Sequence, residues 1–389
     1  MKEKKFIYFD NAATTYHKPE EVIESVIYGL RHMGNNGRGV NEVAISTARI
    51  IYETREKVAK FFNGNDSRCV AFTSNATEAL NTAIKGLCTE KDHVITTEME
   101  HNSVLRPLYE LREKGLEITF LKKEEALKLD REKMKKYLRK NTVALISTHV
   151  SNLTGDIADV ENMGKFSREN GLIFILDASQ SAGVIPVDIE KYNIDILCFT
   201  GHKGLLGPQG TGGLYVREGV KVNPLKSGGS GMETYNERHP ENMPERLEAG
   251  TLNGHGIIGL GAGLDYISGV GIENIHKKET ELMWQFYEGI KNIKDIKIYG
   301  NFFENGKKVE RAPIVTLNLG DIDSGEMCDI LNAEYGIVTR AGGHCAPLMH
   351  RALGTEEQGA VRFSFSYFNS SGEVESAIKA LTEISEEID

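Results

Sequence analysis

Short apolar runs alternate with helical patterns from residue 69 to residue 216, and this alternation limits the folds open to the chain. The runs cover residues 69–73, 93–97, 118–121, 143–147, 172–176, 194–199 and 213–216. The helical patterns between them cover residues 78–87, 102–114, 130–139 and 159–169. Several runs are apolar throughout, as strands covered on both faces are. The alternation predicts an α/β fold with a mostly parallel, seven-stranded sheet, in which ligands bind beyond the carboxyl ends of the strands.

A different pattern begins after residue 226. Residues 227–261 are rich in glycine and contain no strand pattern. Beyond them lie helical patterns at residues 273–292, 323–335 and 371–387 and strand patterns at residues 312–319 and 360–366. With 389 residues, the chain is long enough for two domains. We therefore predict a large domain over residues 16–255 and a smaller α+β domain formed by residues 1–15 and 256–389.

Charge and composition argue against several classes of protein. The formal net charge of −10 argues against a general nucleic-acid binder, and no stretch approaches the roughly 18 apolar residues of a membrane span. The charged residues 1–6 are not followed by the apolar run of a signal peptide. The five cysteines are scattered without CxxC spacing, so neither a disulfide framework nor a metal site is expected. We expect a cytoplasmic protein.

Two neighbouring strand patterns end in side chains that suit a cationic, phosphorylated ligand. Asp177 closes one apolar run, and Gln180 follows three residues later. An aspartate there is also an ordinary helix cap, but a buried anion would keep a ring nitrogen protonated. The next run leads into Thr200, His202 and Lys203, with glycines on both sides. A lone lysine is usually solvated, whereas one in a cofactor site can lose its proton and react as a nucleophile.

Three further strand patterns end in polar side chains. Thr77 lies at the start of the helical pattern after residues 69–73, where free N–H groups suit a phosphate. His101 follows residues 93–97 and could stack on a flat ring, and Asn152 follows residues 143–147 and could bond its phenolic oxygen. Each residue alone is explained by a helix cap, a surface or a core position. Five successive strand ends with compatible groups together favour one cofactor site.

These motifs resemble those of a known family. Asn-Ala-Thr-Glu at residues 75–78, Glu-His-Asn-Ser at 100–103, His-Val-Ser-Asn at 149–152, Asp-Ala-Ser-Gln at 177–180 and Thr-Gly-His-Lys at 200–203 resemble the class V aminotransferases, which are fold-type I enzymes dependent on pyridoxal 5'-phosphate (PLP). The stretches at residues 8–14 and 248–253 are similar too. The segment Arg-Ala-Gly-Gly-His-Cys-Ala-Pro at residues 340–347 resembles the cysteine desulfurases, in the branch related to selenocysteine lyases. The resemblance covers nearly the whole chain.

The resemblance implies how PLP would be held. It makes Lys203 the lysine bonded to the cofactor and Asp177 the partner of the pyridine nitrogen. It makes His101 the ring that stacks on the cofactor and acts in catalysis. The residues that would contact the phenolic oxygen are Asn152 and Gln180. The residues that would contact the phosphate are Ala76 through its N–H, Thr77, Thr200, His202 and, from the neighbouring subunit of a homodimer with shared active sites, Thr251.

The same resemblance implies a reaction. Cys345 would take sulfur from L-cysteine, leaving L-alanine and a persulfide, and pass the sulfur to an acceptor such as a protein that supplies iron–sulfur clusters. The residues that would contact the substrate are Arg362, Asn152 and Arg340, with Arg362 forking onto the carboxylate. An isolated thiol has a pKa of about 8.5, and we expect Arg340 and His344 to lower that of Cys345.

Four alternatives stay open at this point. A selenocysteine lyase and another class V aminotransferase or lyase share the cofactor residues, although Cys345 favours sulfur or selenium chemistry. A PLP-binding regulator without turnover would not need both Lys203 and Cys345. A nicotinamide-binding protein would need a GxGxxG motif after the first strands, which the chain lacks. One departure stands out: Asn41, after residues 37–40, occupies a place where many members of the branch have histidine.

Overall fold

The computed structural model describes residues 6–35 and 41–387. The charged residues 1–5 and the stretch at residues 37–40 therefore lie outside the described part. Asn41, just after the second of these, caps a helix by accepting a hydrogen bond from the Ala44 N–H at 2.9 Å. None of the helices in residues 6–35 and 41–387 is long and apolar enough to cross a membrane.

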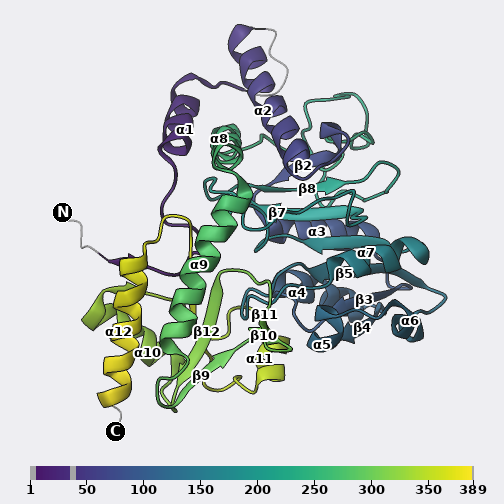
Figure 1. Cartoon of the computed structure of the whole chain (residues 1–389). Helices are drawn as coiled ribbons and strands as arrows, with labels where there is room; N and C mark the ends of the chain where they lie inside the picture. The colour runs from purple at the N-terminus through teal and green to yellow at the C-terminus, as the bar shows by residue number, and fades with distance from the viewer. Residues whose placement is uncertain (1–5, 36–40, 388–389) are drawn as a thin grey trace.

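A seven-stranded sheet forms the centre of the larger part of the molecule (Figure 1). Its strands, in spatial order, are β2 (Val70–Thr73), β8 (Gly212–Val216), β7 (Ile196–Thr200), β6 (Ile173–Asp177), β5 (Thr142–Thr148), β3 (His93–Thr97) and β4 (Glu117–Leu121). The five strands from β7 to β4 pair in parallel, whereas β8 is antiparallel to both of its neighbours. The predicted α/β fold with a mostly parallel sheet is confirmed, and each strand lies within two residues of its predicted range.

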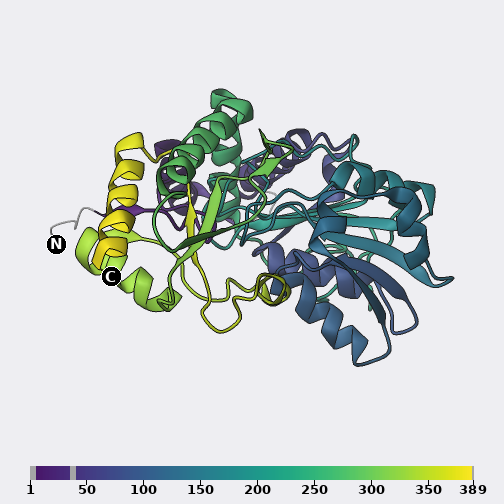
Figure 2. The same ribbon diagram turned by 60° about the horizontal axis from the view of Figure 1, so that its bottom comes forward.

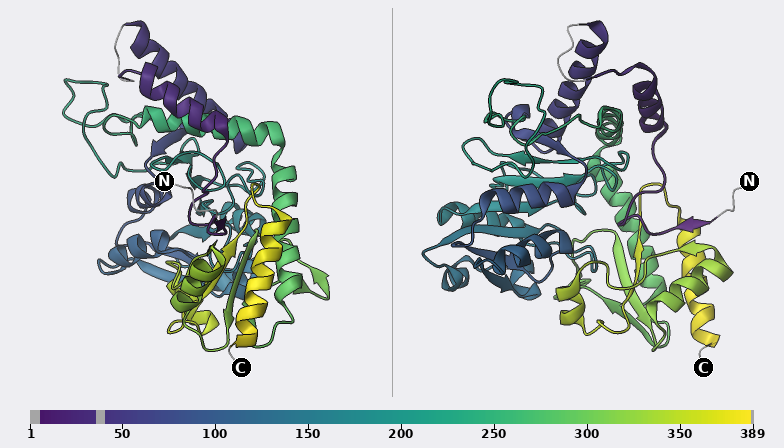
Figure 3. Two further views of the ribbon diagram at one scale, coloured as in Figure 1. Left: turned by 90° about the vertical axis from the view of Figure 1, so that its left-hand side faces the viewer. Right: turned by 180° about the vertical axis from the view of Figure 1, so that it is seen from behind.

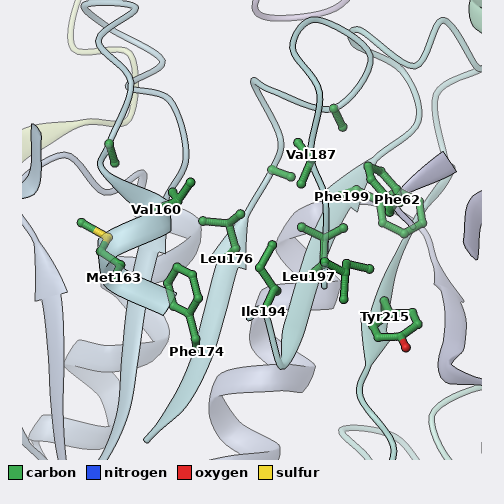
Figure 4. Close-up of a cluster of buried hydrophobic side chains, with 14 of the residues drawn as sticks. Phe62, Val160, Met163, Phe174, Leu176, Val187, Ile194, Leu197, Phe199 and Tyr215 are labelled. Carbon is green, nitrogen blue, oxygen red and sulfur yellow. The ribbon is translucent and has the colours of Figure 1, made fainter. Parts of the chain in front are cut away.

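Apolar cores cover both faces of this sheet, which explains why its strands are apolar throughout. On one face, the helices α3 (Ala76–Leu87) and α4 (Asn102–Arg112) pack over side chains such as Ile175 and Cys198. On the other face, α7 (Val160–Glu169) packs over Phe174, Leu176 and Leu197 (Figure 4). Alternate residues of one strand thus enter different cores, as the period of two requires.

One helical prediction needs correction, and one helix was not predicted. The pattern at residues 130–139 predicted one helix, but the structure has only α6 (Arg131–Met134) followed by a 3-10 turn (Lys135–Tyr137). Met134 is the one buried side chain of these two elements, too small an apolar face to support a longer helix. The glycine-rich residues 227–261 contain no strand, as predicted, but they include the start of α8 (Gly254–Val270).

The glycines of α8 serve close packing, not flexibility. A Cβ atom on Gly263 would lie 2.4 Å from the Leu205 carbonyl oxygen, and one on Gly261 would lie 2.8 Å from Thr54 Oγ1. The helix can therefore approach its neighbours closely, and the side chains of Leu260 and Leu264 join the core of the large sheet. It also packs against α1 (Glu20–His32) and α2 (Glu42–Phe61), which extend beyond the sheet (Figure 3).

A smaller unit lies beside the large sheet (Figure 2). Its three antiparallel strands, in spatial order, are β14 (Val361–Ser364), β12 (Ile314–Leu319) and β9 (Ile296–Tyr299). The helices whose side chains share its core are α9 (Ile272–Ile290), α10 (Ser324–Tyr335) and α12 (Ser371–Glu387). The N-terminal strand β1 (Ile7–Tyr8) pairs with β13 (Ile337–Val338), and Phe9 joins the same core. The division of the chain after residues 15 and 255 stays a prediction.

Candidate active site

The loops at the carboxyl ends of the parallel strands enclose a pocket next to the smaller unit. Four residues that line it were not predicted as cofactor contacts: Asn75, Ser103, Thr148 and Ser179. Nine residues that line it were predicted as cofactor contacts: Ala76, Thr77, His101, Asn152, Asp177, Gln180, Thr200, His202 and Lys203. The parallel topology explains this convergence, because successive strand ends meet at one edge of the sheet.

Lys203 follows β7 and lies in an environment that favours its neutral form. Burial lowers the pKa of Lys203 from 10.5 to about 8, a shift that Arg362 increases and that the carboxylates of Asp177 and Asp10 oppose. An amine must lose its proton before it attacks a carbonyl carbon. The site therefore brings this lysine close to a reactive state at neutral pH.

Asp177 ends β6 and is buried at the floor of the pocket. Its Oδ1 accepts hydrogen bonds from the Ser179 N–H at 2.9 Å and from the Ser179 hydroxyl. Glu100, which sequence reasoning missed, lies fully buried near it. Burial raises the pKa of Glu100 to about 8, and the Asp177 charge adds to this shift, although hydrogen bonds from Thr97 and Thr148 oppose it. Glu100 is therefore mostly neutral at pH 7.

His101 caps α4 and faces the pocket as a neutral ring. Its Nδ1 accepts from the Ser103 N–H at 3.0 Å, so Nε2 carries the proton when the ring is neutral. Burial and the Lys203 charge lower the pKa of His101 to about 4. Ser103 Oγ lies 2.9 Å from His101 Nδ1 and 2.8 Å from Thr77 Oγ1. Ser103 thus joins the predicted stacking ring to a predicted phosphate contact.

The predicted phosphate contacts include the N-terminus of α3. Asn75 caps this helix by accepting from the Glu78 N–H at 2.9 Å. The first N–H groups of a helix have no acceptor within it, so those of Ala76 and Thr77 are suited to an anion. His202 Nδ1 and Asn152 Oδ1 are buried without a hydrogen-bond partner among the described residues. These unpaired atoms, with a nucleophilic amine and a buried carboxylate, fit a phosphorylated aldehyde with a basic ring nitrogen.

Arg362 belongs to strand β14 of the smaller unit, and its side chain contacts the pocket residue Asn152. Its NH2 group donates to Asp10 Oδ1 at 2.9 Å and its NH1 group to the Asn152 carbonyl oxygen at 2.8 Å. Its backbone forms an antiparallel bridge with that of Arg340, so both predicted substrate arginines sit on adjacent segments. Asp10 was not predicted as part of the site. The sequence motif around residue 10 gave a signal for it, but the ion pair depends on tertiary contact.

Cys345 lies on an exposed loop that hydrogen bonds connect to the pocket. Its carbonyl oxygen accepts from the Asn102 N–H at 2.7 Å, and the His344 carbonyl oxygen accepts from Asn152 Nδ2 at 2.7 Å. Asn152 therefore belongs both to the pocket and to the support of the thiol loop. Arg340 and His344 line the open cavity at Cys345.

One expectation about the thiol is wrong. Burial lowers the pKa of His344 to about 3, and the charge of Arg362 adds to the shift. A neutral imidazole cannot supply the positive charge that was expected to stabilise the Cys345 thiolate. Arg340, which is exposed on the same loop, stays as the predicted cation for that role.

The other four cysteines are shielded. Cys69, Cys88 and Cys198 are buried, and Cys328 is partly buried with its sulfur 3.0 Å from Thr339 Oγ1. Burial raises the pKa of Cys88, the one plausible competitor of Cys345, to about 12. Among the cysteines, all of which the structure describes, only Cys345 is exposed.

Thr251 does not line the pocket of its own chain. It is exposed in a separate cavity with Arg55 and Glu248, whose side chains form a buried ion pair at 2.7 Å. Its contact with the cofactor phosphate of a second subunit stays a prediction.

Comparison with known proteins identifies the family. Residues 7–376 match the description Aminotransferase class-V, and the chain belongs to this family of PLP-dependent enzymes. Within the family it belongs among the cysteine desulfurases. Proteins named "Probable cysteine desulfurase" from Pyrococcus abyssi and Methanothermobacter thermautotrophicus are 37% and 34% identical to it, each over 97% of this chain and 94% of the relative.

Solved structures agree with this assignment. The apo structure of cysteine desulfurase from Thermococcus onnurineus NA1 superimposes with a TM-score of 0.89 at 34% identity, covering 98% of this chain and 95% of that chain. The cysteine desulfurase CsdA from Escherichia coli gives a TM-score of 0.84 at 25% identity with the same coverage. The predicted family resemblance and fold are confirmed.

Proposed function

We propose that this protein is a PLP-dependent cysteine desulfurase that converts L-cysteine to L-alanine and carries the sulfur as a persulfide on Cys345. One observation carries the proposal. The exposed Cys345 lies on a loop in which the His344 carbonyl oxygen accepts a hydrogen bond from Asn152, and Asn152 lines the same pocket as Lys203. The names of the relatives and structural neighbours support it over a selenocysteine lyase or another class V enzyme.

The pocket residues would hold the cofactor in the roles predicted above. Bound PLP supplies an aldehyde that bonds amines and a ring that withdraws electrons from the substrate α-carbon. Lys203 would bond to it at rest, and its amine, with a pKa of about 8, would then accept the α-proton. Asp177, which is buried at the end of β6, would pair with the ring nitrogen and keep it protonated. The neutral His101 ring would stack on the cofactor face.

Cys345 would perform the sulfur transfer. Its thiolate attacks the substrate sulfur, so an S–S bond forms while the bond from that sulfur to the substrate β-carbon breaks. The carbon keeps the electron pair and takes a proton, which gives alanine, and the transferred sulfur is oxidised to the sulfane level. An acceptor thiol, such as that of a protein that supplies iron–sulfur clusters, then removes it.

Product analysis tests the proposal. The purified protein with PLP, L-cysteine and a dithiol reductant should form alanine and sulfide in equal amounts, because every sulfur removed leaves one alanine. Both products are quantified from the same reaction, with serine in place of cysteine as the control substrate. Turnover to a keto acid without sulfide would instead favour a class V aminotransferase.

Arg362→Lys should raise the KM for cysteine by about 10- to 100-fold with a smaller change in kcat, because an ammonium lacks the planar fork that binds a carboxylate twice. Lysine keeps the charge opposite Asp10, so the buried ion pair is not simply removed. Arg351→Lys, at an exposed arginine that pairs with Glu356, is the matched control. An unchanged KM in Arg362→Lys would place the carboxylate site elsewhere.

We also propose a homodimer in which Thr251 contacts the cofactor phosphate of the neighbouring subunit. The helices α1 and α2 extend beyond the large sheet (Figure 3), and support comes from their exposed apolar side chains. These side chains are Ile23, Ile27, Tyr28 and Leu30 on α1 and Val43, Ile45 and Tyr52 on α2. Apolar patches of this kind are usual where two proteins associate. Light scattering, which measures the mass in solution, tests the association.

A further inference from the structure

Two buried histidines, one within the Cys345 loop and one in the helix that follows it, have no part in the reaction proposed above. His344 precedes the thiol, and His350 belongs to α11 (Pro347–Leu353). Only 6% and 3% of their surfaces are exposed. Their rings are 5.7 Å apart between centroids, with planes inclined by 7°. Buried polar rings need hydrogen-bond partners, so the contacts of this pair indicate what it does.

The two rings form one continuous chain of contacts. His344 Nε2 lies 3.2 Å from the Arg340 carbonyl oxygen. His344 Nδ1 lies 3.4 Å from His350 Nε2. His350 Nδ1 lies 2.8 Å from the Thr355 hydroxyl and 3.2 Å from the Thr355 carbonyl oxygen, which already accepts from the Gly359 N–H at 3.0 Å.

Donor and acceptor chemistry at the two facing nitrogens favours one direction for this chain. A carbonyl oxygen can only accept, so His344 Nε2 must carry the proton that it donates to Arg340. Burial lowers the pKa of both rings, so each is neutral and His344 Nδ1 must accept. His350 Nε2 then carries the proton, and His350 Nδ1 accepts from the Thr355 hydroxyl at 2.8 Å, a shorter contact than the 3.5 Å from that hydroxyl to the His350 carbonyl oxygen. We therefore assign the Nε2–H tautomer to both histidines.

The loop from Arg340 to Cys345 needs the support of these hydrogen bonds. His344 and Cys345 have φ angles of 49° and 55°, two successive side-chain-bearing residues in the left-handed region. Residues in that region persist only where their surroundings fix them. Asn152 and Asn102 fix the two carbonyl groups, and the His344 ring closes the loop onto the Arg340 carbonyl oxygen.

We propose that His350 is a positioning residue for sulfur transfer: by donating to His344 it holds the loop from Arg340 to Cys345 in the shape that presents the thiol. The inference rests on the proposed role of Cys345 as sulfur acceptor. His350 does not line the Lys203 pocket. Its loss should therefore slow persulfide formation and leave substrate and cofactor binding unchanged.

Two substitutions at His350 test the contribution of each ring nitrogen separately. The amide nitrogen of His350→Gln reaches the place of Nε2 and keeps the donor to His344, whereas that of His350→Asn reaches only the place of Nδ1. We expect His350→Asn to slow single-turnover persulfide formation by about tenfold, the loss of one net hydrogen bond, with unchanged KM and cofactor content. His350→Gln should stay within about threefold of the wild type. Thr355→Val and Thr355→Ser form a second pair, in which only valine removes the hydroxyl.

The outcomes are distinguishable. Nitrogen-15 shifts of the histidines in the wild-type holoenzyme should show Nε2–H tautomers for His344 and His350, and an Nδ1–H tautomer for either would overturn the assignment. Equal persulfide rates in His350→Gln and His350→Asn would overturn the positioning role, because a purely packing role does not depend on which nitrogen is kept.

A wild-type enzyme that never carries sulfur on Cys345 would refute the proposed function instead. Melting temperatures identify any variant that fails to fold, and the Thr355 pair then decides.

Discussion

Cys345→Ser should retain PLP and the wild-type melting temperature but release sulfide from L-cysteine at least about a thousandfold more slowly, because a hydroxyl is a far weaker nucleophile than a thiolate. The thiol is exposed and serine differs from cysteine by one atom, so stability should change little. Intact-mass analysis after a pulse of cysteine should show one added sulfur atom on the wild type and none on the variant.

Cys69→Ser is the matched control for this prediction, since it removes a buried thiol from the 3-10 turn Ser67–Cys69 before β2, which is remote in sequence from the loop. It should keep sulfide release. Selenocysteine gives a sharper comparison, because selenium leaves more easily than sulfur. A Cys345→Ser enzyme that still acts on selenocysteine would be a desulfurase that tolerates selenium. Full activity on cysteine, with the extra sulfur on Cys88 or nowhere, would contradict the mechanism.

Lys203→Ala should lower the turnover rate on cysteine by at least about 10⁴-fold. The substitution removes both the covalent anchor of the cofactor and the base that accepts the α-proton. The purified wild type should be yellow, and borohydride should fix the cofactor mass to the peptide that contains Lys203.

Lys18 provides a stringent internal control for that labelling. Burial lowers its pKa to about 8 as well, and its amine donates to the His202 carbonyl oxygen at 3.0 Å. A low pKa alone would therefore permit reaction at either lysine, whereas the pocket geometry permits it only at Lys203. Label on the Lys18 peptide would refute the assignment of the anchor.

The large sheet was predictable because its strands are buried on both faces, which leaves continuous apolar runs such as that before Asp177. The convergence of the strand ends followed from the parallel topology alone. Helix α8 was missed because its glycines look like loop residues. Their role depends on backbone groups such as the Leu205 carbonyl, which approach only in the folded chain.

The supporting residues of the site were harder to predict than its motifs. Glu100 and Ser103 flank His101 in the sequence, but their roles depend on contacts with Thr148 and Thr77 from other elements. The expected charge on His344 was wrong because sequence proximity to Cys345 does not reveal burial. Motif residues define the chemistry, whereas the protonation states around them are set by tertiary packing.

The shielding of four thiols and the exposure of Cys345 have a consequence for the enzyme under oxidative stress. Thiol oxidation by peroxide requires both access and thiolate character, and burial opposes both for Cys88 and Cys198. Thiol oxidation should therefore begin at a single cysteine in each chain. Once its sulfur atom reached the sulfinic state, the protein would stay folded and keep its cofactor, yet it would no longer mobilise sulfur. The residue that makes the protein useful is thus also its most vulnerable point.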